Sequence, residues 1–187
     1  MRIGFAYTGS FCTIFQSIEI MKKLVDMGIE IVPIMSYNAY STDTRFGDAI
    51  TIRNKVSEIT GREIINTIVD AEPLGPQTKL DALVISPCTG NTLSKIANGI
   101  TDTPVCMAAK AHLRNNKPLI IALASNDALS ANLKNIATLL SRKNVYFTPM
   151  IQDDPINKPH SLVADFELIE NTLNLALKGV QITKIFI

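Results

Sequence analysis

Residues that could hold a planar, anionic ligand follow an apolar run at residues 82–85. The six positions 87–92 read Pro87, Cys88, Thr89, glycine, Asn91 and Thr92, which are small or polar residues. Hydroxyl groups, an amide and free backbone N–H groups are therefore concentrated where a buried strand gives way to a helix. α/β proteins use such groups to bind a polar-edged ring that carries a phosphate. The segment predicts one wall of a cofactor site.

Two other strands are predicted to end in small polar residues. Gly9 and Ser10 follow a strand expected at residues 2–7, and Ser36 follows one expected at 29–35. In an open parallel sheet, ligands bind outside the carboxyl ends of the strands. Gly9 permits a tight turn, and the helix after it can offer unpaired N–H groups to an anion. We therefore expect the hydroxyl groups of Ser10 and Ser36 to reach the same phosphate.

Each of these features also has an ordinary structural interpretation. The turn at residues 8–10 could be a plain helix start, and Asn91 or Thr92 could be a plain helix cap. Cys88 could be a small buried residue or part of the pocket wall. With no histidine or other base beside it in the sequence, a nucleophilic role is not indicated. Only the convergence of three strand ends favours a binding site.

Other polar side chains give weaker evidence of a functional site than the strand ends do. His112 and His160 are far apart and lack neighbours at metal-ligand spacing, so no metal site is expected. Lys110 and Arg114 are four residues apart and would share one face of a helix. That face is either a solvated basic surface or an anchor for a dianionic substrate.

Apolar strands alternate with helices along the chain, which favours an α/β fold. Further strands are expected at residues 119–124 and 145–147, and helices near 42–59, from Asp127 onward and from Asp165 onward. Strands that are apolar throughout are typical of a mostly parallel sheet covered on both faces. We predict one doubly wound sheet in a single domain over residues 1–187, with a C-terminal loop and helix from about residue 150.

Composition limits the class of protein. The 187 residues carry a formal net charge of +1, and 47% are hydrophobic, so no broad field favours nucleic acid or a membrane surface. Three widely spaced cysteines suit a reducing compartment better than a disulfide framework, and no run is apolar enough to span a bilayer. We therefore expect a cytoplasmic protein.

Residues 87–92, continued by Lys95-Ile96-Ala97, Gly99 and Asp102, resemble a signature of the FMN-binding flavoprotein family. That signature reads Pro-Ala-Ser-Ala-Asn-Thr, then Lys-Ile-Ala-x-Gly-x-x-Asp. The resemblance implies FMN as the cofactor, a doubly wound α/β fold and a homo-oligomer of trimers or multiples of trimers. The cofactor-binding residues that we predict are Gly9, Ser10, Phe11, Ser36, Asn38, Pro87, Cys88, Thr89, Asn91, Thr92 and Ala109.

Four further segments, at residues 71–76, 107–114, 125–129 and 152–155, resemble the branch of this family that acts in dipicolinic acid biosynthesis. This closer resemblance implies a sporulation oxidoreductase in the mother cell of an endospore former. The implied reaction dehydrogenates a dihydrodipicolinate to dipicolinic acid, with hydride passing to the flavin. The implied partner is the Rossmann-type A subunit of dipicolinate synthase.

The sequence departs from the cysteine decarboxylases of the family at two places. No histidine occurs between residues 61 and 81, and residues 108–111 stand where those decarboxylases carry Pro-Ala-Met-Asn. We therefore predict Lys110 and Arg114 as the catalytic clamps for the two substrate carboxylates. Two alternatives remain open: an FMN-dependent decarboxylase or prenyl-FMN-type enzyme of the same fold, and a non-catalytic protein that stabilises the Rossmann-type partner.

Overall fold

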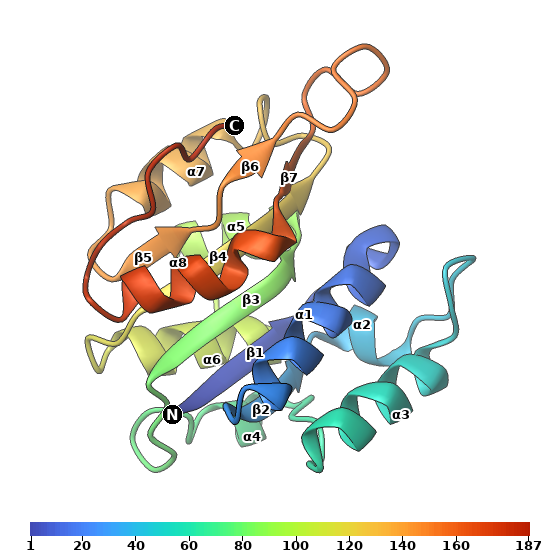
Figure 1. Cartoon of the computed structure of the whole chain (residues 1–187), viewed down its shortest axis with the longest axis vertical. Coiled ribbons are helices and arrows are strands. Elements are labelled where there is room, and N and C mark those ends of the chain that lie inside the picture. The colour runs from blue at the N-terminus through green and yellow to red at the C-terminus, as the bar shows by residue number, and fades with distance from the viewer.

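Seven strands form one sheet in the computed structural model, which describes all residues 1–187 (Figure 1). The parallel part has the order β2-β1-β3-β4-β5, and two short antiparallel strands, β7 and β6, continue from the end of β4. The bounds are β1 Arg2–Tyr7, β2 Glu30–Met35, β3 Ala82–Cys88, β4 Leu119–Ser125, β5 Val145–Phe147, β6 Met150–Ile151 and β7 Leu162–Ala164. The predicted doubly wound, mostly parallel sheet is confirmed.

Helices cover both faces of this sheet (Figure 1). One buried cluster lies under α4, α5, α6 and α7, and the other lies under α1, α2, α3 and α8. The bounds are α1 Ile14–Asp26, α2 Tyr37–Ser41, α3 Ala49–Thr60, α4 Ile68–Ala71, α5 Gly90–Ala97, α6 Pro104–Leu113, α7 Leu133–Leu140 and α8 Ile169–Ala176. Alternate residues of β1 pack into different clusters: Phe5 and Tyr7 belong to one, and Ala6 belongs to the other.

Two predicted helices begin later than expected. Residues 42–48 form a loop because Asp48 caps α3, accepting a hydrogen bond from Thr51 N at 2.8 Å. The helix predicted from Asp127 begins only at Leu133. The Asp127 carboxylate accepts hydrogen bonds from Ser125 and Asn132 side chains, so it closes a turn in place of capping a helix.

The C-terminal tail, an apolar segment in the sequence, lies beside β6. Met150 N donates to Ile185 O at 2.7 Å, and Ile187 N donates to Met150 O at 3.1 Å. Phe186 remains half exposed in this arrangement. None of the helices has the length and apolar character that crossing a bilayer requires.

Candidate functional site

A pocket of about 850 Å³ lies at the carboxyl ends of β1, β3 and β4. Five segments line it: residues 9–13, 45–46, 89–91, 124–127, and a last group that comprises Asp153, Lys158, Ser161 and Val163. The carboxyl edge of an open α/β sheet is where ligands of such folds bind. The volume lies within the range of about 300–1,000 Å³ that is usual for small-molecule sites.

The turn after β1 forms the first wall. Gly9, Ser10 and Phe11 line the pocket before α1 begins, and the Ser10 carbonyl accepts hydrogen bonds from the N–H group of Thr13 at 3.2 Å and from its hydroxyl at 3.1 Å. The Ser10 side chain caps no backbone N–H group of this turn. Since the first N–H groups of a helical turn have no partner inside it, this wall presents donors to an anion.

The β3–α5 junction forms the second wall, and buried Thr8 holds it against the first. The Thr8 hydroxyl donates to Pro87 O at 2.7 Å and accepts from Thr89 N at 2.9 Å. Thr89 then caps α5 by accepting from Thr92 N at 3.2 Å. The ends of β1 and β3 are therefore joined by hydrogen bonds, and the start of α5, including Asn91, faces the pocket.

The end of β4 forms the third wall around Asp127. Its carboxylate accepts a hydrogen bond from the Ser125 hydroxyl at 2.5 Å and bonds from Asn132 Nδ2 at 2.9 and 3.0 Å. The hydrogen bond from Ser125 is the main reason that the pKa of Asp127 lies below its usual value. Asp127 is therefore a fixed negative charge on this wall at neutral pH.

Gly90 packs directly against this group. A β-carbon at position 90 would overlap Ser125 Oγ and lie 2.5 Å from Asn132 Nδ2 and 2.8 Å from Asp127 Oδ1. Only a residue without a side chain fits there. The absence of a side chain at Gly90 lets the second and third walls approach each other.

The structure brings together five of the predicted cofactor-binding residues at this pocket: Gly9, Ser10, Phe11, Thr89 and Asn91. Three others lie next to it without lining it. Ser36 is buried and accepts from Ala39 N at 3.3 Å as the cap of α2, and its own N–H group donates to Tyr7 O. Asn38 lies close to Gly9, and the buried hydroxyl of Thr92 is bonded to Thr89.

Three predicted cofactor-binding residues have side chains that do not line the pocket. Pro87 contributes its carbonyl group to the Thr8 bridge. Cys88 and Ala109 are buried in the core cluster beneath α5 and α6, because alternate residues of β3 and the inner face of α6 pack there. Of the two interpretations of Cys88, the structure supports the small buried residue. Burial raises the pKa of its thiol far above the usual value, which leaves it un-ionised.

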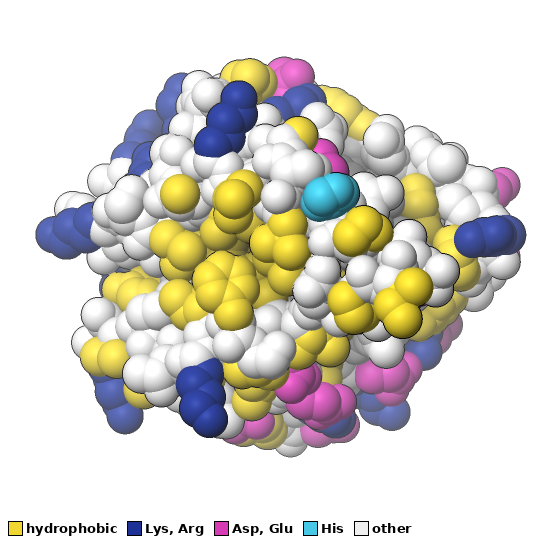
Figure 2. All heavy atoms as spheres, turned by 90° about the horizontal axis from the view of Figure 1, so that it is seen from above, with side chains coloured by type: hydrophobic (Ala, Val, Ile, Leu, Met, Phe, Trp, Pro, Cys, Tyr) yellow, Lys and Arg dark blue, Asp and Glu magenta, His cyan; other side chains and the backbone are white.

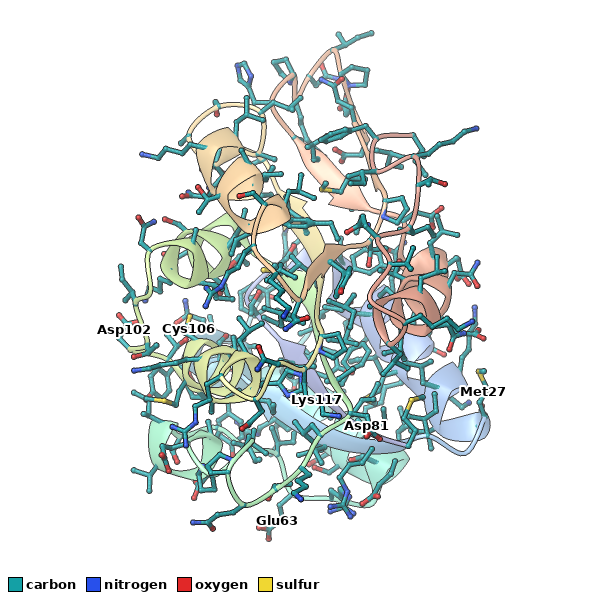
Figure 3. All side chains as sticks on the ribbon, turned by 90° about the vertical axis from the view of Figure 1, so that its left-hand side faces the viewer. Met27, Glu63, Asp81, Asp102, Cys106 and Lys117 are labelled. Atoms are coloured by element: carbon teal, nitrogen blue, oxygen red, sulfur yellow. The ribbon has the colours of Figure 1, made fainter.

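The predicted clamps Lys110 and Arg114 do not line this pocket. Both are exposed near the end of α6, and that end lies at the amino edge of the sheet. His112 Nε2, two residues before Arg114, is 3.0 Å from Pro118 O, directly before β4. In Figure 3, Lys117 lies beyond this end of α6 and close to Asp81, which precedes β3. The helix runs antiparallel to the strands and carries both side chains away from their carboxyl ends.

Two groups of pocket residues were not predicted from the sequence. The run Ser125, Asn126 and Asp127 follows a buried strand in the same way as the three strand ends that were used, so the same signal could have found it. Arg45 and Lys158 come from segments predicted as a helix and as a surface loop. Nothing in their local sequence indicates that these segments fold over the strand ends. No group of three His, Cys, Asp or Glu side chains is arranged to hold a metal ion.

The sequence profile of the Flavoprotein family matches residues 1–171. The chain belongs to the flavoprotein family. This flavoprotein is 46% identical over 186 residues to the B subunit of dipicolinate synthase from Bacillus subtilis (strain 168), an alignment that covers 100% of this chain and 93% of that protein. It is 27% identical to the flavin prenyltransferase UbiX of Archaeoglobus fulgidus, over 93% of this chain and 91% of that protein.

Solved structures agree with this assignment. The crystal structure of the dipicolinate synthase B subunit from Bacillus halodurans C matches the flavoprotein with a TM-score of 0.91 and 45% identity, over 100% of this chain and 95% of that chain. The FMN-dependent cysteine decarboxylase SpaF matches with a TM-score of 0.70 and 23% identity, over 94% and 97% of the two chains. The second similarity shows a shared fold.

Proposed function

We propose that this flavoprotein is the flavin-binding B subunit of a dipicolinate synthase and acts in sporulation with the Rossmann-type A subunit of that enzyme. The observation that carries the proposal is the 46% identity to a dipicolinate synthase B subunit over the full chain. The proposed reaction is the dehydrogenation of a dihydrodipicolinate to dipicolinic acid in the mother cell of an endospore former.

The pocket fits FMN by the chemistry of its donors. The unpaired N–H groups of Phe11 and Cys12 and the Ser10 hydroxyl would hold the phosphate. The start of α5, with Thr89 and Asn91, would hold polar edges of the ring system, and the close approach at Gly90 keeps this wall flat. When bound, the flavin would accept a hydride from the dihydropyridine ring. The protein's own residues would orient that ring and exclude water from it.

Replacing Asn91 by alanine tests the assignment of the second wall. Asn91 is exposed in the pocket, so the variant keeps the fold and loses polar contacts to the flavin. We expect FMN affinity to fall about tenfold, equivalent to about 1.4 kcal/mol, in a fluorescence titration. An unchanged dissociation constant together with an unchanged melting temperature would remove Asn91 from the site.

Replacing Lys110 by methionine tests the catalytic role predicted for this residue. Because Lys110 is exposed on α6 and does not line the pocket, the flavin affinity and the substrate KM of the reconstituted enzyme should both stay unchanged. Steady-state kinetics at varied substrate concentration would measure this. A rise in KM would return Lys110 to the substrate site.

We propose that the flavoprotein assembles into a homo-oligomer, as trimers or multiples of trimers, and contacts the Rossmann-type partner. Apolar side chains gather in the middle of the face seen in Figure 2. Exposed apolar residues of the molecule include Ile156, which is 88% exposed, and Phe186 and Ile187 of the C-terminal tail. Exposed apolar patches of this kind are typical of protein–protein contacts.

Anaerobic mixing of the FMN-loaded flavoprotein with the Rossmann-type partner and dihydrodipicolinate tests the proposed function. Bleaching of the flavin absorbance with formation of dipicolinate is expected. Dipicolinate formation by variants that bind no flavin would instead identify a stabilising role. Release of carbon dioxide from a substrate, or prenylation of the flavin, in the absence of the partner would favour the decarboxylase or prenyl-FMN alternative, and the 27% identity to flavin prenyltransferase UbiX supports testing for both.

A further inference from the structure

Positive charge in the pocket comes from two loops. Arg45 lies between α2 and α3, and Lys158 lies between β6 and β7. Figure 1 shows these as two separate projections of the chain. The pocket also contains the carboxylates of Asp127 and Asp153, so the partners of each cation decide whether it is free to bind a ligand.

Arg45 has no acidic partner. It forms no ion pair, and its guanidinium carbon lies 4.8 Å from the centre of the Phe46 ring. Phe46 is itself 42% exposed, although it lines the pocket. A cation stacked on an aromatic ring keeps its outward N–H groups available to a carboxylate.

The turn that carries Arg45 is closed by hydrogen bonds. Thr44 N donates to Gly47 O at 3.0 Å, and Gly47 N donates to Thr44 O at 3.1 Å. The Thr44 hydroxyl also accepts from Phe46 N at 3.2 Å. Gly47 has φ 154° and packs on the Phe15 ring of α1, whose atoms would lie 3.1 Å from a β-carbon at position 47. Arg45 and Phe46 therefore lie on a hydrogen-bonded turn that packs against α1.

The ammonium group of Lys158 can bind a ligand carboxylate at a small cost in free energy. Its ammonium group lies 3.0 Å from the Asp153 carboxylate, and the two side chains are 54% and 29% exposed. An ion pair that is exposed to this extent contributes little to stability, so a substrate carboxylate can replace Asp153 as the partner of Lys158. Asp127, in contrast, is tied to Ser125 and Asn132 and would repel a carboxylate from the third wall.

We propose that Arg45 binds one carboxylate of the pyridine dicarboxylate and that Lys158 binds the other. Arg45 would be the main determinant of specificity, because its planar guanidinium forms two parallel hydrogen bonds with a carboxylate. Phe46 would act as a positioning residue for Arg45. This inference rests on the proposed function, since it names the residues that recognise the substrate of that reaction.

Calorimetric titration of the FMN-loaded protein with dipicolinate and with picolinate, which lacks one carboxylate, tests the proposal. The wild-type protein should bind dipicolinate at least tenfold more tightly than picolinate. In Arg45→Met and in Lys158→Met, dipicolinate affinity should fall at least tenfold and the preference over picolinate should shrink. Arg45→Lys should retain part of the preference for dipicolinate, and Lys143→Met, at an exposed lysine outside the pocket, is the matched control.

The outcomes separate the two proposals. If the wild-type protein binds dipicolinate tightly and both loop variants keep the full preference for dipicolinate over picolinate, the proposed carboxylate binding by Arg45 and Lys158 is wrong. The proposed function then still stands. If the variants lose FMN affinity but keep the preference for dipicolinate, Arg45 and Lys158 bind the cofactor. The proposed carboxylate binding by these two residues is then also wrong. If the wild-type protein binds neither acid and gives no dipicolinate with the Rossmann-type partner, the proposed function itself fails.

Discussion

Replacing Gly90 by alanine is expected to destabilise the protein and to weaken flavin binding. The new methyl group would occupy space held by Ser125 Oγ, Asn132 Nδ2 and Asp127 Oδ1. Ser125 and Asn132 both donate hydrogen bonds to Asp127, and Asn132 also accepts one from buried Asn135. These side chains therefore have little freedom to move. Overpacking of this kind costs about 1–3 kcal/mol.

The substitution should also weaken flavin binding. If the β4 wall keeps its place, α5 must shift outward, and the Thr89 and Asn91 donors shift with it. FMN affinity should fall at least about tenfold, since a misplacement worth about 1.4 kcal/mol has that effect. Thermal unfolding and fluorescence titration of the same preparation measure both quantities.

A second substitution tests whether the overlap with Ser125 Oγ causes the loss of stability. Ser125→Ala removes the oxygen that a β-carbon at Gly90 would overlap most, so adding it to Gly90→Ala should recover part of the lost melting temperature. Ser125→Ala alone serves as the control for the lost hydrogen bond to Asp127. If Gly90→Ala binds FMN as the wild type does, the close approach of the two walls has no role in the site.

Replacing Thr8 by valine is the second change with a large expected effect. Thr8 is 1% exposed, and its hydroxyl both donates to Pro87 O and accepts from Thr89 N. Valine has the same shape and no hydroxyl, so the Thr89 N–H group is left without its acceptor inside the protein. A buried polar group without a partner costs about 1–3 kcal/mol.

For a chain of this length, each kcal/mol lowers the melting temperature by about 2–4 °C. FMN affinity should fall as well, because the bridge sets the position of Thr89 relative to the turn after β1. Thr8→Ser keeps the hydroxyl and should retain most of the stability. Equal melting temperatures for Thr8→Val and the wild type would show that the bridge contributes nothing.

The fold could be predicted from the sequence because its strands are apolar throughout. Runs such as Leu119–Ser125 have polar residues only at their ends, so both the parallel sheet and its binding edge follow from one pattern. Gly9, Ser10, Thr89 and Asn91 were found by their position after such runs. Local sequence sufficed because these residues lie directly at the strand ends.

The residues that we propose to bind the substrate could not be predicted in this way. Lys110 and Arg114 were predicted from their place where the decarboxylase motif is replaced and from their spacing on one helix, yet that helix runs away from the carboxyl edge of the sheet. Arg45 and Lys158 reach the pocket through loops whose course depends on the Thr44–Gly47 turn and on the pairing of β7 with β4. The packing of this turn on Phe15 and the pairing of β7 with β4 are tertiary contacts, which have no local signal in the sequence.

Titration of the purified wild-type protein with FMN and with riboflavin tests the central claim most directly. We expect quenching of flavin fluorescence that saturates at one FMN per chain, and weaker binding of riboflavin, which lacks the phosphate held by the turn at residues 9–13. A colourless protein that quenches neither flavin would contradict the assignment of this pocket.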